Sequence, residues 1–93
     1  MPRPCKRRRI RGRPNSSYFK PAGIRMIELE EIVLTREEFE AIKLKDSLGL
    51  EQKKCAEKME ISQPTFHRLI SSARGKIGKA IVEGKAIRIG GEI

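Results

Sequence analysis

The chain has 93 residues and a formal net charge of +9, with two cysteines and a single histidine. This length fits one domain with a small core. No apolar run approaches the roughly 20 residues that span a bilayer, and the sequence has no CxxC pair of the kind found in four-ligand zinc sites. The charged N-terminus has no apolar segment after it, so we expect a cytoplasmic protein without a secretion signal or a membrane partner. We also expect no metal or other cofactor. The basic excess favours a polyanion, such as nucleic acid, as the partner.

Residues 1–23 are predicted to form a flexible, basic, proline-rich arm. Its four prolines do not fit inside helices, and it holds eight Lys or Arg and no acid. Tyr18 and Phe19 are expected to dock the end of the arm onto a domain that spans residues 24–93. The RGRP segment at residues 11–14 is similar to the core of an AT-hook. It would either enter the minor groove of DNA or only hold phosphates.

Residues 24–33 are expected to form a short strand or an extended lead-in to a first helix at about 35–47. Thr35 and Glu38 fit a capping box, in which the two side chains satisfy backbone N–H groups of the first turn. Gly49 then ends the helix, because glycine is favoured where a helix terminates in a left-handed residue.

A tight turn is predicted between a second helix at about 52–59 and a third at about 62–83. Ser62 is a good N-cap for the third helix, and Gly84 marks its end. The turn needs one left-handed residue, and Glu60 stands there at a cost on the order of 1 kcal/mol.

The third helix has an apolar stripe that extends to Ile81, but Gly75 and Gly78 inside it each cost about 1 kcal/mol relative to Ala. After it, Ile87 and Ile89 alternate with a charged residue, which indicates a short strand. This strand would pair with the lead-in or with another subunit, so a homodimer stays open. The predicted fold class is mainly α, a three-helix helix-turn-helix domain with a flexible basic arm and short terminal strands.

The second and third helices have the residues that a helix-turn-helix unit needs. Ala56 falls where the helices cross, and apolar residues occupy the core positions, namely Cys55, Met59, Ile61, Phe66 and Leu69. Five side chains then point outward at the start of the third helix, which in this geometry enters the major groove by its N-terminal end. These candidate base-reading residues are Ser62, Gln63, Thr65, His67 and Arg68.

Basic residues in three segments are candidate contacts to phosphates or the minor groove. They are Arg7, Arg8, Arg9, Arg11, Arg13, Lys53, Lys54, Arg74 and Lys76. Glu51 is a poor N-cap, and Lys53 and Lys54 near the start of the second helix oppose its dipole. These residues indicate either sequence drift on an exposed helix face or contacts to phosphates. For Arg74 and Lys76 in the third helix, the alternative to phosphate contact is that they only form part of a solvated helix face. The glutamates of residues 28–40, Glu38 included, are expected to face solvent rather than to bind a metal.

Several motifs connect the chain to known families. Residues 34–81 resemble the last DNA-binding region of sigma factors. The whole chain is similar to a family of small prokaryotic proteins known as domain of unknown function 134, through motifs at residues 1–4, 8–10, 18–24, 34–41, 56–59, 62–68 and 82–89. This resemblance implies a sigma-like helix-turn-helix that binds DNA, and it supplies no target.

The function expected from the sequence is therefore sequence-specific binding of double-stranded DNA in the regulation of transcription, without catalysis. The first alternative is a sigma-like module that docks on RNA polymerase through the acidic surface near the first helix. The second is binding of structured RNA through the arginine-rich arm. An enzyme is least expected, because no catalytic set is recognised among the residues.

Overall fold

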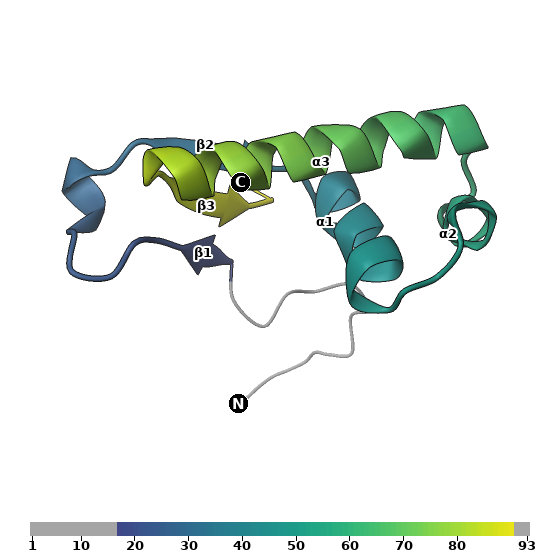
Figure 1. The fold of residues 1–93 in the computed structure, drawn as a ribbon, viewed down its shortest axis with the longest axis horizontal. Coiled ribbons are helices and arrows are strands. Elements are labelled where there is room, and N and C mark those ends of the chain that lie inside the picture. Colours follow the sequence, from purple (N-terminus) through teal and green to yellow (C-terminus); the bar gives the residue numbers. More distant parts are fainter. Residues whose placement is uncertain (1–16, 91–93) are drawn as a thin grey trace.

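The computed structural model describes residues 17–90, and its longest helix extends along most of the molecule (Figure 1). In chain order the elements are β1 (Tyr18–Phe19), the 3-10 helix η2 (Met26–Glu28), β2 (Glu31–Leu34), α1 (Arg36–Ile42), the π-helical turn η3 (Lys43–Ser47), α2 (Gln52–Met59), α3 (Gln63–Glu83) and β3 (Ala86–Ile89). α1 and α2 lie against the first half of α3, and the strands lie beside its second half (Figure 1). The described chain is mainly helical with a small sheet, as the sequence predicts.

The three strands form one sheet in the order β1-β3-β2. β1 is antiparallel to β3, with Tyr18 opposite Arg88, and β2 is parallel to β3, with Leu34 opposite Ile89. Tyr18 and its neighbour therefore dock as expected, although the sheet begins inside the range assigned to the arm. Because β3 is paired on both sides, the lead-in is its partner, and neither of its edges is open to another subunit.

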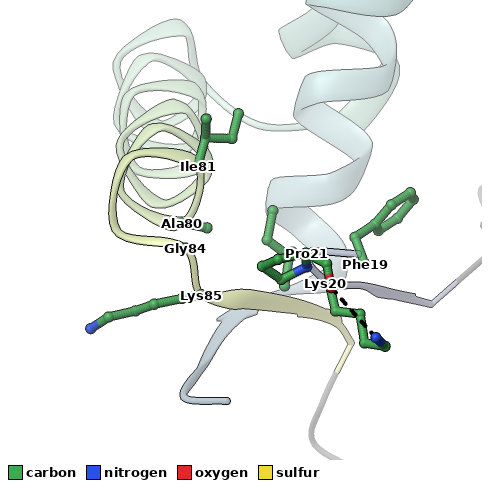
Figure 2. A pocket seen from close by; sticks show the side chains of 8 residues that line it. Phe19, Lys20, Pro21, Ala80, Ile81, Gly84 and Lys85 are labelled. Carbon is green, nitrogen blue, oxygen red and sulfur yellow. Dashed lines mark hydrogen bonds between the residues drawn. The ribbon is translucent and has the colours of Figure 1, made fainter. Parts of the chain in front are cut away.

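A pocket of about 330 Å³ lies between the sheet and the last turns of α3 (Figure 2). Phe19 and Pro21 lie on one side of it, and Ala80 and Ile81 of α3 lie on the other (Figure 2). Lys20 and Pro21, from the chain between β1 and η2, are among the residues that line it.

The apolar core consists of two clusters, one on each half of α3. The first lies between α1, η3, α2 and α3 and contains Ala41, Leu44, Cys55, Ala56, Phe66 and Ile70. The second lies between β2, β3 and α3 and contains Leu34, Ala73 and Ile89. The core positions predicted in the second and third helices are confirmed, since Met59, Ile61 and Leu69 pack against the first cluster. Burial raises the pKa of the free Cys55 thiol, in keeping with its place in this core.

The first helix differs from its prediction as a single α-helix over residues 35–47. The α-helical hydrogen bonds stop at Ile42, and the next turn is π-helical, closed by a bond from Leu48 N to Lys43 O of 2.9 Å. Within this wider turn Leu44 is buried and Asp46 meets Arg74 of α3. The turn is thus fixed by contacts to a neighbouring helix that local sequence patterns do not report.

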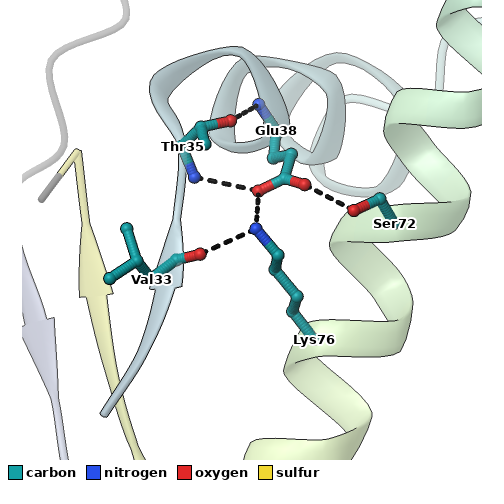
Figure 3. Close-up of polar contacts among 5 residues, drawn as sticks. All are labelled: Val33, Thr35, Glu38, Ser72 and Lys76. Carbon is teal, nitrogen blue, oxygen red and sulfur yellow. Dashed lines mark hydrogen bonds and ion pairs between the residues drawn. The ribbon is translucent and has the colours of Figure 1, made fainter. Parts of the chain in front are cut away.

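The capping box at the start of α1 extends into a polar network that joins α1 to the middle of α3 (Figure 3). Glu38 is only 5% exposed. Its carboxylate accepts hydrogen bonds from Thr35 N at 2.9 Å, Ser72 Oγ at 2.5 Å and Lys76 Nζ at 2.8 Å. Lys76 Nζ also donates to Val33 O at 2.8 Å. The expectation that the glutamates of this region face solvent is therefore wrong for Glu38.

The ionisation of Glu38 follows from this network. Burial alone would raise the pKa of its carboxyl, but the hydrogen bonds from Lys76, Ser72 and the backbone of Thr35 together outweigh burial and hold the pKa below its ordinary value. The carboxylate is thus charged at neutral pH and paired with Lys76, whose side chain is itself two-thirds covered.

Candidate nucleic-acid interface

The turn between α2 and α3 sets the direction in which α3 starts. Glu60 adopts the left-handed conformation, with φ 61° and ψ 42°, as expected at this position. The backbone N–H of Ile61 then bonds to Ala56 O at 3.1 Å, which closes the end of α2. Ala56 is buried between α2 and α3, so no bulky side chain holds the two helices apart at this position. The first turn of α3 begins at the surface, where Ser62, Gln63 and Pro64 are exposed.

Ser62 caps α3 and begins a chain of hydroxyl contacts along its first turns. Its Oγ accepts from Thr65 N at 3.2 Å and donates to Thr65 Oγ1 at 2.9 Å. Thr65 Oγ1 also accepts a bond of 3.3 Å from Nη2 of Arg68. Arg68 is thereby held along its own helix and is an exposed residue. The three residues form a small preorganised unit at the start of α3.

The five predicted base-reading residues share this end of α3 but differ in exposure. Gln63, His67 and Arg68 are exposed, whereas Thr65 is half-buried and the hydroxyl of Ser62 serves as the cap. Ser71, which the sequence reasoning missed, is also exposed and follows His67 at a spacing of four. Because residues four apart lie on one face of a helix, that spacing was the available signal. An amide, an imidazole, a guanidinium and a hydroxyl thus line one surface.

The start of α2 precedes this surface in the sequence. Lys53 and Lys54 are exposed in its first turn, and Glu51 at the N-cap makes no side-chain capping bond, as the sequence indicates. Two ammonium groups there oppose the helix dipole and lower the stability of α2. An anion bound at this position would relieve that repulsion.

The other predicted phosphate contacts do not join this group. Arg74 binds Asp46 through two hydrogen bonds of 3.0 and 2.5 Å, and the guanidinium holds the pKa of that carboxyl below its ordinary value. Lys76 lies in the Glu38 network, turned toward α1 and β2 (Figure 3). The five arginines predicted in the arm, Arg7, Arg8, Arg9, Arg11 and Arg13, lie outside the described residues.

The described residues hold neither a metal-binding cluster nor a membrane-spanning helix. Between residues 17 and 90, no three His, Cys, Asp or Glu side chains are grouped so that they would hold a metal ion. No helix in the same range combines the length and apolar character needed to cross a bilayer.

The sequence matches a family model over residues 1–93, and that model is described as "Protein of unknown function DUF134". The chain belongs to this family. It is 59% identical over 91 residues to UPF0251 protein TTE1845 of Caldanaerobacter subterraneus subsp. tengcongensis, which covers 98% of this chain and 77% of the relative. It is 54% identical over 93 residues to UPF0251 protein DET0218 of Dehalococcoides mccartyi, which covers 100% of this chain and 80% of the relative. No solved structure matches the chain.

Proposed function

We propose that this protein binds double-stranded DNA in a sequence-specific manner and regulates transcription. The observation that carries the proposal is the start of α3, where exposed Gln63, His67 and Arg68 follow a tight turn and Arg68 is held by Thr65. An α-helix fits the major groove, which is about 12 Å wide. The arrangement of α2, turn and α3 supports the sigma-like helix-turn-helix reading of the sequence, in which the second helix of the pair enters that groove.

Each side chain has a role that follows from its hydrogen-bonding groups. The Gln63 amide offers a donor and an acceptor that match the major-groove edge of adenine. The Arg68 guanidinium matches the two acceptors of guanine, and its contact with Thr65 reduces the freedom that it loses on binding. His67 lies between them on the exposed face and contacts a base or a phosphate.

Phosphate binding is divided between α2 and the arm. Residues 51–68 hold four basic and three acidic residues, so this part of the surface alone has little net charge. Lys53 and Lys54 therefore hold the phosphates next to the groove, whereas the arm, with its eight Lys or Arg, supplies most of the long-range attraction. Arg74 and Lys76 contribute less, because contact with phosphate would have to compete with Asp46 and Glu38.

Fluorescence anisotropy of the full chain with labelled duplex DNA, duplex RNA and single strands tests this proposal. We expect the tightest binding to duplex DNA and a steep loss of affinity between about 50 and 200 mM salt. Selection from a duplex library with a randomised central segment should then enrich a defined site. Tighter binding to RNA, or a library that stays random, would overturn the proposal.

Two substitutions separate base reading from phosphate binding. Arg68→Ala is expected to cost about 1–3 kcal/mol on the enriched site and to relax preference at one position. Lys53→Ala is expected to weaken binding to all duplexes alike and to reduce the salt slope by about 1. Lys79→Ala, which removes the same charge from an exposed position far along α3, is the matched control and should change neither.

A further inference from the structure

The helix α3 holds no acidic residue before its last position. From Ile61 to Val82 the sequence has no Asp or Glu, and the nearest acid before this stretch belongs to the turn that precedes the helix. The exposed polar side chains on the first turns are an amide, an imidazole, a guanidinium and a hydroxyl, from Gln63, His67, Arg68 and Ser71. The side chains that α3 itself presents at its start therefore offer N–H and O–H donors but no carboxylate.

The guanidinium of Arg68 is held in place without being neutralised. Three other arginines of the described chain pair with carboxylates at 2.5 to 2.9 Å, namely Arg25, Arg74 and Arg88. Within residues 17–90, Arg68 instead bonds to a neutral hydroxyl, that of Thr65, at 3.3 Å, and has no acidic partner. Its charge and its remaining N–H groups are therefore open to an acceptor from another molecule.

The major-groove edges of the bases differ in how well they match these side chains. Guanine offers two acceptors, N7 and O6, which suit a guanidinium, whereas adenine offers an acceptor and a donor, which suit an amide. Cytosine offers only an amino donor, and its usual partner is a carboxylate. Because α3 has no carboxylate at its start, its side chains match the purines and leave cytosine without its usual partner.

We propose that the start of α3 recognises its DNA site through the N7 and O6 acceptors of purines, with a guanine at Arg68 and an adenine at Gln63. This inference rests on the proposed function and narrows its target. Gln63 and Ser71 are eight positions apart, about 12 Å along the helix at 1.5 Å per residue. At a rise of about 3.4 Å per base pair, the contacted purines fall within about three or four consecutive base pairs.

Duplexes that contain 7-deazaguanine test this inference on the site that the randomised library enriches. The analogue replaces N7 by a C–H group and keeps Watson–Crick pairing. We expect it to raise the dissociation constant about fivefold or more at the enriched guanine, because a donor of Arg68 loses its acceptor. Fluorescence anisotropy measures the change. The same analogue at a guanine outside the enriched positions is the control and should leave the dissociation constant unchanged.

The contact is assigned to Arg68 by repeating the measurement on Arg68→Ala. This variant has already lost the donor, so natural guanine and 7-deazaguanine should bind it equally well. An effect of the analogue that persists in Arg68→Ala would overturn the assignment.

Gln63→Glu tests the role of the missing carboxylate. Glutamate has the length of glutamine but only accepts hydrogen bonds, so library selection with this variant should enrich cytosine in place of adenine at one position. Gln52→Glu adds the same charge at the first residue of α2 and is the matched control. It should leave the selected bases unchanged. An acid suits the first turn of a helix, so circular dichroism of both variants should match that of the original chain.

This inference and the proposed function fail separately. A library that stays random overturns the proposed function, and the purine contacts with it. A defined site on which 7-deazaguanine binds as tightly as guanine, or on which Gln63→Glu selects the same bases as the original chain, overturns only the purine contacts, because sequence-specific binding of DNA has then been observed.

Discussion

The two halves of α3 differ in what they bury and in what they expose. The first half packs on α1 and α2 and exposes polar side chains such as Gln63 and His67, whereas the second half packs on the sheet and exposes Ile81 and Val82. A single helix thus carries two surfaces of different chemistry, one polar and one apolar. Because the two surfaces lie on different halves of the helix, we expect substitutions in one surface to leave the other intact.

The largest expected effect concerns the polar network that joins α1 to the middle of α3, between these halves. Glu38→Ala removes the carboxylate that binds Ser72 and Lys76, so we expect a loss of about 2–4 kcal/mol in the free energy of unfolding. The exposed neighbour Glu37→Ala should change stability by about 0.5 kcal/mol or less. Urea unfolding followed by circular dichroism measures both. Equal effects of the two substitutions would show that the network between α1 and α3 does not stabilise the fold.

A smaller effect is expected at the turn that starts the first half. Glu60 has a positive φ, which glycine adopts without strain, so Glu60→Gly should raise the free energy of unfolding by about 1 kcal/mol. Glu57→Gly inside α2 should lower it by about 1 kcal/mol. Thermal and urea unfolding of both variants provide the measurement, and a loss of stability in Glu60→Gly would mean that the side chain has a contact outweighing the strain.

The contact between Thr65 and Arg68 should affect recognition more than stability. Thr65→Val keeps the shape of the side chain and removes the hydroxyl, so we expect a loss of about 0.5–1 kcal/mol in binding to the enriched duplex and little change on random duplexes. Thr65→Ser retains the hydroxyl and should bind like the original chain. If the valine variant binds both duplexes normally, Thr65 does not position Arg68.

The smallest expected effect concerns the sheet beside the second half. Hydrogen bonds from Arg88 and Tyr18 lower the pKa of Glu31 from 4.5 to about 2. Because the pKa is lower in the folded chain, this contribution to stability is complete above about pH 4.5 and disappears as the pH falls toward 2. Unfolding curves of the original chain and of Glu31→Gln should therefore converge in acid. Parallel curves would contradict the role of this carboxylate.

The helices could be predicted from the sequence because their ends are encoded locally. Thr35, Ser62 and Gly84 are capping residues that act within one turn, and the structure places each of them as predicted. Contacts between distant residues carry no such signal. Asp46 and Arg74 are 28 positions apart, and Glu38 and Lys76 are 38 apart, so the π-helical turn and the buried network could not be anticipated.

The candidate site divides in the same way. Helical periodicity predicts the exposure of His67 and Arg68 correctly. The same periodicity places Ile81 on the apolar stripe of the third helix, and the structure leaves it 73% exposed. Whether an apolar position is covered depends on what the rest of the chain brings over it, and Ile81 lines a pocket instead of packing in the core.

NMR spectroscopy of the ¹⁵N-labelled full chain, titrated with the enriched duplex, tests the central claim most directly. If the first half of α3 reads DNA, the largest amide shift changes within residues 17–90 will lie at Gln63, His67 and Arg68, with smaller ones at Lys53 and Lys54. Amides on η2 and on the last turns of α3, such as those of Ile27 and Val82, will keep their positions relative to the free protein. Changes that centre on these amides, or that spare the start of α3, would contradict the account.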